Sequence, residues 1–189
     1  MPTRISYVDG SVEPVTLAEA KLAARFDGDD LDALIAGAIT AARESAEQIT
    51  GRIYRPQVLR TELDDWPADA IAVSAATGCA IKYWTAGGFA ALAGSAYAFA
   101  AGGIGGNGTV IAPAIGASWP ALADRAAGPR VQIDLTAGPA SPASVPEQVK
   151  LYIKATVAAW VRSPEAMTST SLAPNPLHER LLDAERTFA

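Results

Sequence analysis

The sequence predicts an α+β protein that is mainly helical, with helices packed together, a small antiparallel β insertion and a C-terminal tail. Helix-capping signals followed by helically spaced apolar residues occur near the start of the chain and again after residue 143. Short apolar runs separated by glycines occupy the middle. A Ser/Thr/Pro-rich stretch then precedes the last apolar residues. We therefore expect one domain over residues 1–162 and an extended tail with a short terminal helix over 163–189.

The first expected helix covers about residues 17–25. Thr16 and Glu19 have the spacing of a capping box, in which each side chain satisfies a backbone amide of the other residue. The aspartate- and glycine-rich residues that follow interrupt the chain before the next helix.

A second, longer helix is expected over about residues 30–50, ended by Gly51. Asp29 or Asp30 is expected to cap it, because acidic groups suit the positive end of a helix dipole. Its apolar residues share one face at helical spacing, namely Leu31, Leu34, Ile35, Ala38, Ile39, Ala42 and Ile49.

The β-rich insertion is expected over about residues 57–138. An alternating run at Gln57–Asp64 predicts a strand, and alternation again predicts one over residues 131–136. Between these strands lie short apolar runs with glycines around them, at 71–73, 79–85, 97–100 and 109–112. Several short strands with turn signals indicate a small antiparallel sheet or barrel.

The third expected helix covers about residues 145–161, after a second capping box formed by Ser144 and Glu147. The tail beyond it carries an apolar stripe on its expected terminal helix, made of Leu177, Leu181, Leu182 and Phe188. Two interpretations of this stripe stay open. It packs on its own domain, or it docks on a partner, which the loose Ser/Thr/Pro tether before it favours.

Charge is unevenly distributed along the chain, whose net charge is −5. Residues 1–69 hold 7 basic and 13 acidic groups, whereas Lys82 is the one charged residue between 70 and 123. An acidic balance argues against nucleic-acid binding, which depends on Lys and Arg neutralising phosphates. No uninterrupted run of 18 apolar residues exists, and the start lacks the apolar run of a signal peptide, so we expect a protein made in the cytoplasm.

Possible chemical sites are few. Gly103–Gly108 matches the dinucleotide-binding pattern, but the residues after it predict a strand and not the required helix. A small ligand- or nucleotide-binding domain using the glycine-rich loop 102–108 stays the alternative function. A single cysteine, Cys79, and a single histidine, His178, cannot form a usual zinc site and leave little basis for nucleophilic catalysis. We expect no catalytic residues, no metal and no cofactor.

Five motifs in order resemble the head–tail connector (adaptor) proteins of long-tailed phages, prophages and gene transfer agents. The resemblance covers about residues 12–162. The motifs are Pro14–Lys21, the helix with Ala41–Arg43 and Thr50–Arg52, Trp66–Pro67, Gly116–Pro120 before a strand ending at Ala137–Gly138, and Val145–Glu147 before a helix ending near Trp160. The glycine- and alanine-rich middle departs from the family pattern.

The resemblance implies a structural adaptor without catalysis. In that family, copies form a ring, expected to be of twelve, between the portal protein and a tail-side stopper or tail-terminator protein. The ring extends the DNA channel at the head–tail junction of a virion or phage-like particle, where DNA passes without specific binding. Since a ring subunit needs apolar or small side chains facing its neighbours, Trp119, Ile104 and Phe99 are candidate inter-subunit residues.

Overall fold

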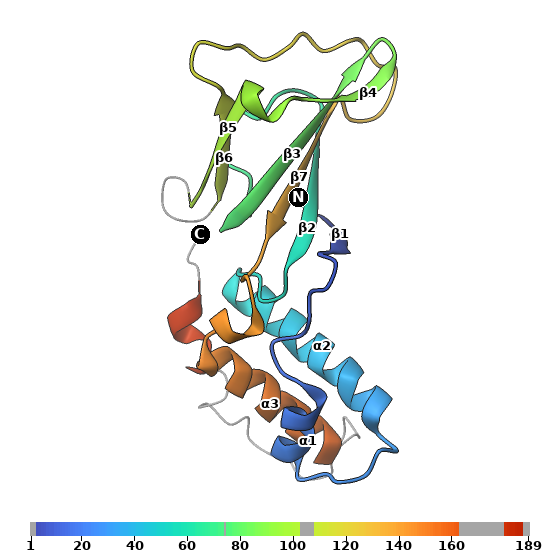
Figure 1. Cartoon of the computed structure of the whole chain (residues 1–189), viewed down its shortest axis with the longest axis vertical. Helices are drawn as coiled ribbons and strands as arrows, with labels where there is room; N and C mark the ends of the chain where they lie inside the picture. Colours follow the sequence, from blue (N-terminus) through green and yellow to red (C-terminus); the bar gives the residue numbers. More distant parts are fainter. Residues whose placement is uncertain (1–2, 74, 103–107, 163–179, 187–189) are drawn as a thin grey trace. The chain divides into compact units, whose positions relative to one another are not determined.

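The computed structural model describes residues 3–73, 75–102, 108–162 and 180–186. The chain divides into two compact units (Figure 1). The β unit contains residues 3–10 and the described part of 56–138, and the helical unit contains residues 11–55, 139–162 and 180–186. Each unit is built from segments far apart in the sequence, because the chain enters the β unit, leaves it and returns.

The helical unit holds the three α-helices of the described residues: α1 (Leu17–Ala24), α2 (Asp32–Thr50) and α3 (Glu147–Arg162). Two short 3-10 turns, Pro142–Ser144 and Asp183–Glu185, belong to the same unit. None of the helices among the described residues combines the length and the apolar character needed to cross a membrane.

The start of α1 has the predicted capping box. The Glu19 amide donates to Thr16 Oγ1 at 3.2 Å, and the Thr16 amide donates to Glu19 Oε2 at 2.8 Å. The predicted cap of α2 is wrong: the N-cap residue is Leu31, with no side-chain hydrogen bond. Asp29 instead accepts from Lys21 Nζ, which ties the α1–α2 connection to α1.

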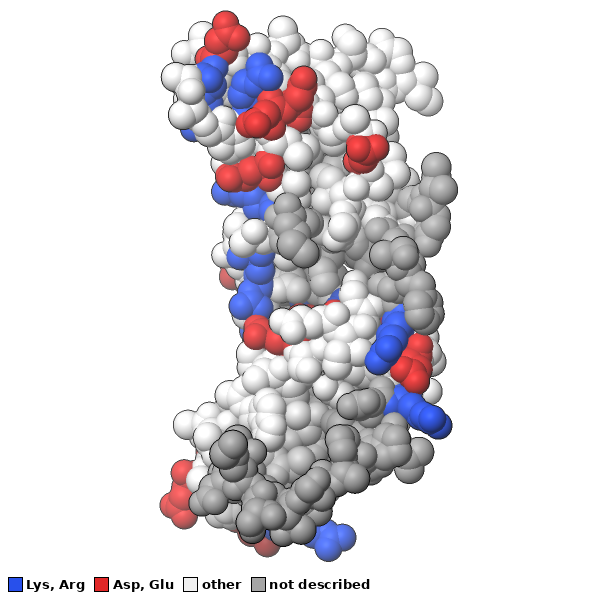
Figure 2. All heavy atoms as spheres, turned by 180° about the vertical axis from the view of Figure 1, so that it is seen from behind, with Lys and Arg blue, Asp and Glu red and all other residues white. Residues whose placement is uncertain are grey.

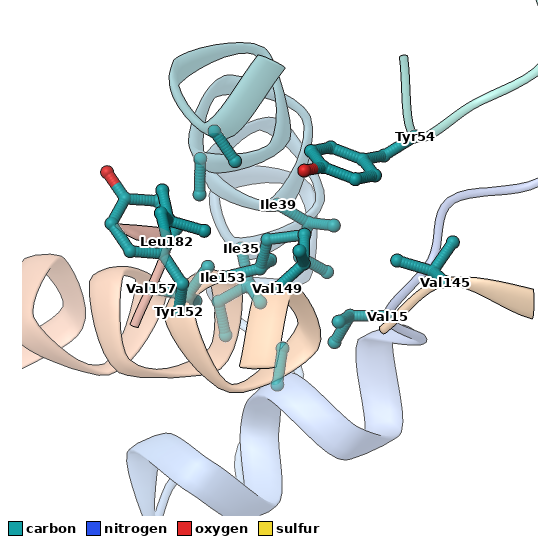
Figure 3. Packing of buried hydrophobic residues seen from close by; sticks show 13 residues of the cluster. Val15, Ile35, Ile39, Tyr54, Val145, Val149, Tyr152, Ile153, Val157 and Leu182 are labelled. Carbon is teal, nitrogen blue, oxygen red and sulfur yellow. The ribbon is translucent and has the colours of Figure 1, made fainter. Parts of the chain in front are cut away.

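The core of the helical unit lies where the three helices meet (Figure 3). Residues from all three helices and from the segments around them are buried in it, namely Val15, Ala20, Ile35, Ile39, Ala42, Ala46, Tyr54, Val145, Val149, Tyr152, Ile153, Val157 and Leu182. Alanines on α2 let α3 approach closely, since a methyl group takes little space between packed helices. At the end of α2, Gly51 adopts a left-handed conformation with φ 70°.

Within its described residues, the β unit holds seven strands: β1 (Thr3–Tyr7), β2 (Gln57–Leu63), β3 (Ala76–Thr85), β4 (Gly88–Ala91), β5 (Tyr97–Ala101), β6 (Thr109–Pro113) and β7 (Val131–Ala137). Five of them form an antiparallel sheet in the order β1-β2-β7-β3-β4, and β5 and β6 form a separate hairpin (Figure 1). The central strand β7 comes last in the sequence.

The register of the five-stranded sheet separates an apolar face from a polar one. On β7, Val131, Ile133 and Leu135 are fully buried. Between them, Asp134 points to the opposite face, where Arg60 of β2 donates to both of its carboxylate oxygens at 2.7 and 2.8 Å. The alternation read in the sequence of this strand is therefore the alternation between the two faces.

The β5–β6 hairpin lies beside the five-stranded sheet. Ile71 and Thr109 exchange two backbone hydrogen bonds of 2.9 and 2.8 Å. At the other strand of the hairpin, the Tyr97 hydroxyl donates to the Cys79 carbonyl at 2.6 Å. A Cβ at Gly108 would lie 2.8 Å from the Ile71 carbonyl oxygen, so this close approach requires glycine.

The prediction of a mainly helical protein is wrong. Three α-helices stand against seven strands among the described residues, and the strands form two sheets. Two of the strands, β1 and β4, carry no clear alternation in the sequence. They form because β2 and β3 each offer an open edge for pairing, which depends on contacts between segments far apart.

Candidate assembly surfaces

The uncharged middle of the sequence becomes a patch on the β unit. Lys82, its one charged residue, lies in β3 opposite Gln132 of β7, on the polar face of the five-stranded sheet. In Figure 2, which shows the molecule from behind, the right-hand part of the β unit over β5 and β6 is largely white. Charged side chains gather instead on the other side of this unit.

The outer face of the β5–β6 hairpin is formed by four side chains: Ala98, Ala100, Val110 and Ala112. The register pairs Ala98 with Ala112 and Ala100 with Val110, and all four are exposed. The opposite face carries Thr109 and Ile111, both of which are buried. A two-stranded sheet with apolar side chains on both faces lacks the polar outer face typical of antiparallel sheets in water.

The backbone edges of the hairpin differ from each other. In an antiparallel pair, every second residue of a strand directs its amide and carbonyl toward the partner strand. The hydrogen bonds from Gly102 to Gly108 and from Ala114 to Ala96 show that even-numbered residues of β5 do so, and the amides of Phe99 and Ala101 therefore point away from β6. No backbone hydrogen bond within the described residues joins these outward groups to another strand. The edge of β5 is therefore open, without a charge or a proline along its length.

The edge of β6 is blocked at both of its ends. Thr109 pairs there with Ile71, and Pro113 has no amide hydrogen to donate.

A second apolar surface lies in the helical unit, as a groove of about 440 Å³ between α2 and α3. It is lined by Ala33, Leu34, Gly37, Ala38, Ala41, Trp160 and Val161. Leu34 is 57% exposed and Trp160 is 44% exposed, although both are large and apolar. Small residues on α2 make the hollow, and the indole of Trp160 forms part of its wall.

The three predicted inter-subunit residues have different surroundings. Phe99 lies on β5 and is 37% exposed. Trp119 is half-buried and stacks on Trp66, with ring centroids 4.5 Å apart and planes 5° apart. The Trp66 indole also donates to the Pro120 carbonyl at 3.0 Å, so this aromatic pair fastens the loop after β6 within the β unit. Ile104 lies outside the described residues.

The predicted docking stripe of the tail is described in part. Leu182 is fully buried in the core of the helical unit, and Leu181 packs against that core. Near them, Glu185 accepts from Arg52 at 3.1 Å. Leu177 and Phe188 lie outside the described residues. The described part of the stripe thus contacts its own unit, as the first of the two open interpretations expects.

The described side chains that could take part in catalysis are either unreactive at neutral pH or engaged in local structure. Burial raises the pKa of the Cys79 thiol to about 11, so little nucleophilic thiolate forms near neutral pH. Asp65 accepts from the Trp66 amide at 2.8 Å in the turn after β2. No cluster of three His, Cys, Asp or Glu residues able to hold a metal occurs within the described ranges. His178 lies outside them.

The glycine-rich loop joins two strands of one hairpin. Gly102 and Gly108 close it with a backbone hydrogen bond of 2.7 Å, and β6 follows directly. Residues 103–107 lie outside the described ranges. A dinucleotide site of the glycine-rich type places its pyrophosphate at a helix N-terminus, and the element after this loop is a strand.

The sequence pointed to the hairpin through its uncharged middle and Phe99, but it identified neither the outer face of the hairpin nor the groove. The signal for the hairpin face was present: Thr109–Pro113 has apolar or small residues at successive positions, without the alternation that predicts one exposed polar face. The sequence signal for the groove is weaker. Leu34 belongs to the apolar stripe of α2, and its position in the stripe does not tell that the packed helices leave it exposed.

No protein-family model and no curated protein matches the sequence. Three chains of solved structures share its fold, and each match covers 100% of this chain and 96% of the other. They come from the virion of a native gene transfer agent particle (TM-score 0.73, 21% identity), the neck of an empty particle computed with C6 symmetry (0.71, 20%), and the neck of a native particle computed with C12 symmetry (0.67, 20%). The predicted resemblance to gene transfer agent proteins is confirmed at the level of fold: the chain has the fold of chains from the virion and neck of these particles.

Proposed function

We propose that this chain is a structural subunit of the head–tail junction of a phage-like particle, without catalytic activity. The observation that carries the proposal is the likeness to neck chains, which extends over the whole chain. The apolar surfaces of both units support it, because a subunit surrounded by neighbours needs such surfaces.

In more detail, copies of the chain form a ring of twelve between the portal protein and a tail-side stopper or tail-terminator protein. One of the similar neck structures was computed with C12 symmetry, which favours this number. The ring extends the DNA channel at the head–tail junction of the particle. The stripe of Leu177, Leu181, Leu182 and Phe188 stays a candidate portal contact through its residues outside the described ranges.

Co-expression with the portal protein of the same genome tests the proposal. Electron microscopy of the purified complex should show rings stacked on the portal, with the mass of about twelve copies of this chain. If both proteins are folded and the portal nevertheless purifies without this chain, the result would contradict the proposal. A monomeric state of the chain alone decides nothing, because a ring of this kind can form on the portal. Removing residues 163–189 tests the tail, and unchanged portal binding would exclude it as a contact.

The proposed channel lets DNA pass without specific binding. The net charge of −5 supports this, since Lys and Arg supply most of the affinity of proteins for phosphates. A gel-shift assay at low salt should show no complex between the portal-free chain and duplex DNA. A complex that persists at 0.15 M salt would contradict a channel that DNA slides through.

A further inference from the structure

We infer that the outer face of the β5–β6 hairpin, together with the open edge of β5, is the surface on which a second copy of this chain packs. The contact extends the hairpin across the boundary between subunits, and the inference rests on the proposed ring. It names a surface within the ring that the family likeness leaves open.

The first argument is the chemistry of the outer face. Ala98, Ala100, Val110 and Ala112 are its four paired side chains, and none of them can hydrogen-bond with water or carry charge. A sheet face that stays in water normally carries polar side chains, as the face of the five-stranded sheet that contains Arg60 does. Three of the four side chains are methyl groups, so another sheet or helix can approach the hairpin closely.

The second argument is the open edge. The amides and carbonyls of Phe99 and Ala101 that point away from β6 have no backbone partner among the described residues. Proteins usually protect such an edge with a charge, a proline or a bulge. The β6 edge is protected by Ile71 and by Pro113, whereas the sequence of β5, Tyr97–Ala101, contains none of these devices.

The nature of the surface favours a copy of this chain as the occupant. A nucleic acid requires basic side chains, and the one charged residue between 70 and 123, Lys82, lies on the five-stranded sheet. The hairpin packs on its own unit through β6 and has only two strands, so a strand from a neighbour would extend it at the β5 edge. In a ring every copy has a neighbour, which contacts this face with a different patch of the same sequence, and an apolar face without charge requires no complementary charge on that patch.

Two variants test the inference in the portal–ring complex. Ala100→Lys places an ammonium group on the outer face. Ala101→Pro removes only an outward amide of β5 and keeps the hydrogen bonds to β6. The matched control is Ala80→Lys, an exposed alanine on the polar face of the five-stranded sheet, opposite Asp134. We expect ring particles counted by electron microscopy to fall by about tenfold or more for the two test variants and to stay unchanged for the control.

Rings formed at wild-type yield by both test variants would overturn the inference and leave the proposed function intact. Rings that form but fail to recruit the tail-side protein would also overturn it, since the face would then belong to that protein. Failure of the wild-type chain to form rings would instead contradict the proposed function.

Hydrogen exchange provides a measurement that needs no variant. The amides of Phe99 and Ala101 should exchange at least about tenfold more slowly in the ring than in the free chain if their outward groups gain partners. Equal exchange rates in the two states would overturn the inference even if the substituted chains fail to fold.

Discussion

Replacing Arg43 by alanine should destabilise the helical unit strongly. Its guanidinium donates from Nε to Glu13 at 2.8 Å and from Nη1 to Glu47 at 2.7 Å. Glu47 in turn accepts from the amide of Tyr54 at 2.8 Å, and Glu13 accepts from Arg55 at 2.9 Å. Through these bonds one side chain of α2 holds the segment before α1 and the turn after α2. The alanine variant breaks the network at its centre.

The magnitude follows from burial. Arg43 is fully buried, and removing one partner of a buried ion pair costs about 3–5 kcal/mol because the other charge loses its compensation. Glu13 and Glu47 each keep another donor, so the expected loss is near the low end, about 3 kcal/mol. For a protein of this length, that loss lowers the midpoint of thermal unfolding by roughly 6–12 °C.

Circular dichroism at 222 nm measures the expected loss, because the α-helices lie in the helical unit. The control is Arg52→Ala, which removes a partly exposed side chain paired with Glu185 at 3.1 Å and should cost about 1 kcal/mol or less. An Arg43→Ala variant that melts within 2 °C of this control, a margin of about 0.5–1 kcal/mol, would refute the assigned role of the network.

Three further outcomes are expected. Thr16→Ala should cost about 1 kcal/mol in urea unfolding by removing the α1 cap. The backbone amide and the side chain of Thr16 donate to Glu19 and lower its pKa, so the cap stabilises the fold at neutral pH and is lost as the pH falls below about 4.5. Because Thr16→Ala keeps the backbone bond, the variant that tests this shift is Glu19→Gln, which has no carboxylate to titrate and should lose less stability on acidification. Gly108→Ala should cost roughly 1–3 kcal/mol, since its Cβ meets the Ile71 carbonyl at 2.8 Å. With its pKa of about 11, Cys79 should react with iodoacetamide at pH 8 about 200-fold more slowly than an ordinary cysteine.

Each of these outcomes has a matched comparison. Gly94→Ala is the control for Gly108, because a Cβ at Gly94 meets no atom within 4 Å. Equal stabilities of the two alanine variants would contradict the close packing of β6 against Ile71. An acid profile of Glu19→Gln parallel to that of the wild type would contradict the lowered pKa of Glu19. For Cys79, urea-unfolded protein is the comparison, and equal labelling rates in the folded and unfolded states would contradict a raised thiol pKa.

Local interactions made some parts of this protein predictable from sequence. The capping box at Thr16 and Glu19 involves residues three apart, and the left-handed Gly51 ends α2. The alternation of Val131–Ala137 appears unchanged in the buried and exposed sides of β7. Even so, a local rule failed at Asp29: α2 begins after Leu31, which has no capping side chain, and the Asp29 carboxylate accepts from Lys21 instead.

The sequence by itself determined where charge is absent, which segments are helical and which family the chain resembles. Only the tertiary structure decided the balance of helix and sheet, because β1 and β4 depend on edges offered by distant strands. It likewise decided which apolar residues are covered: Leu182 is buried, while Leu34 and the outer face of the β5–β6 hairpin are exposed. Burial depends on what packs against a side chain, and segments far apart in the sequence provide that packing.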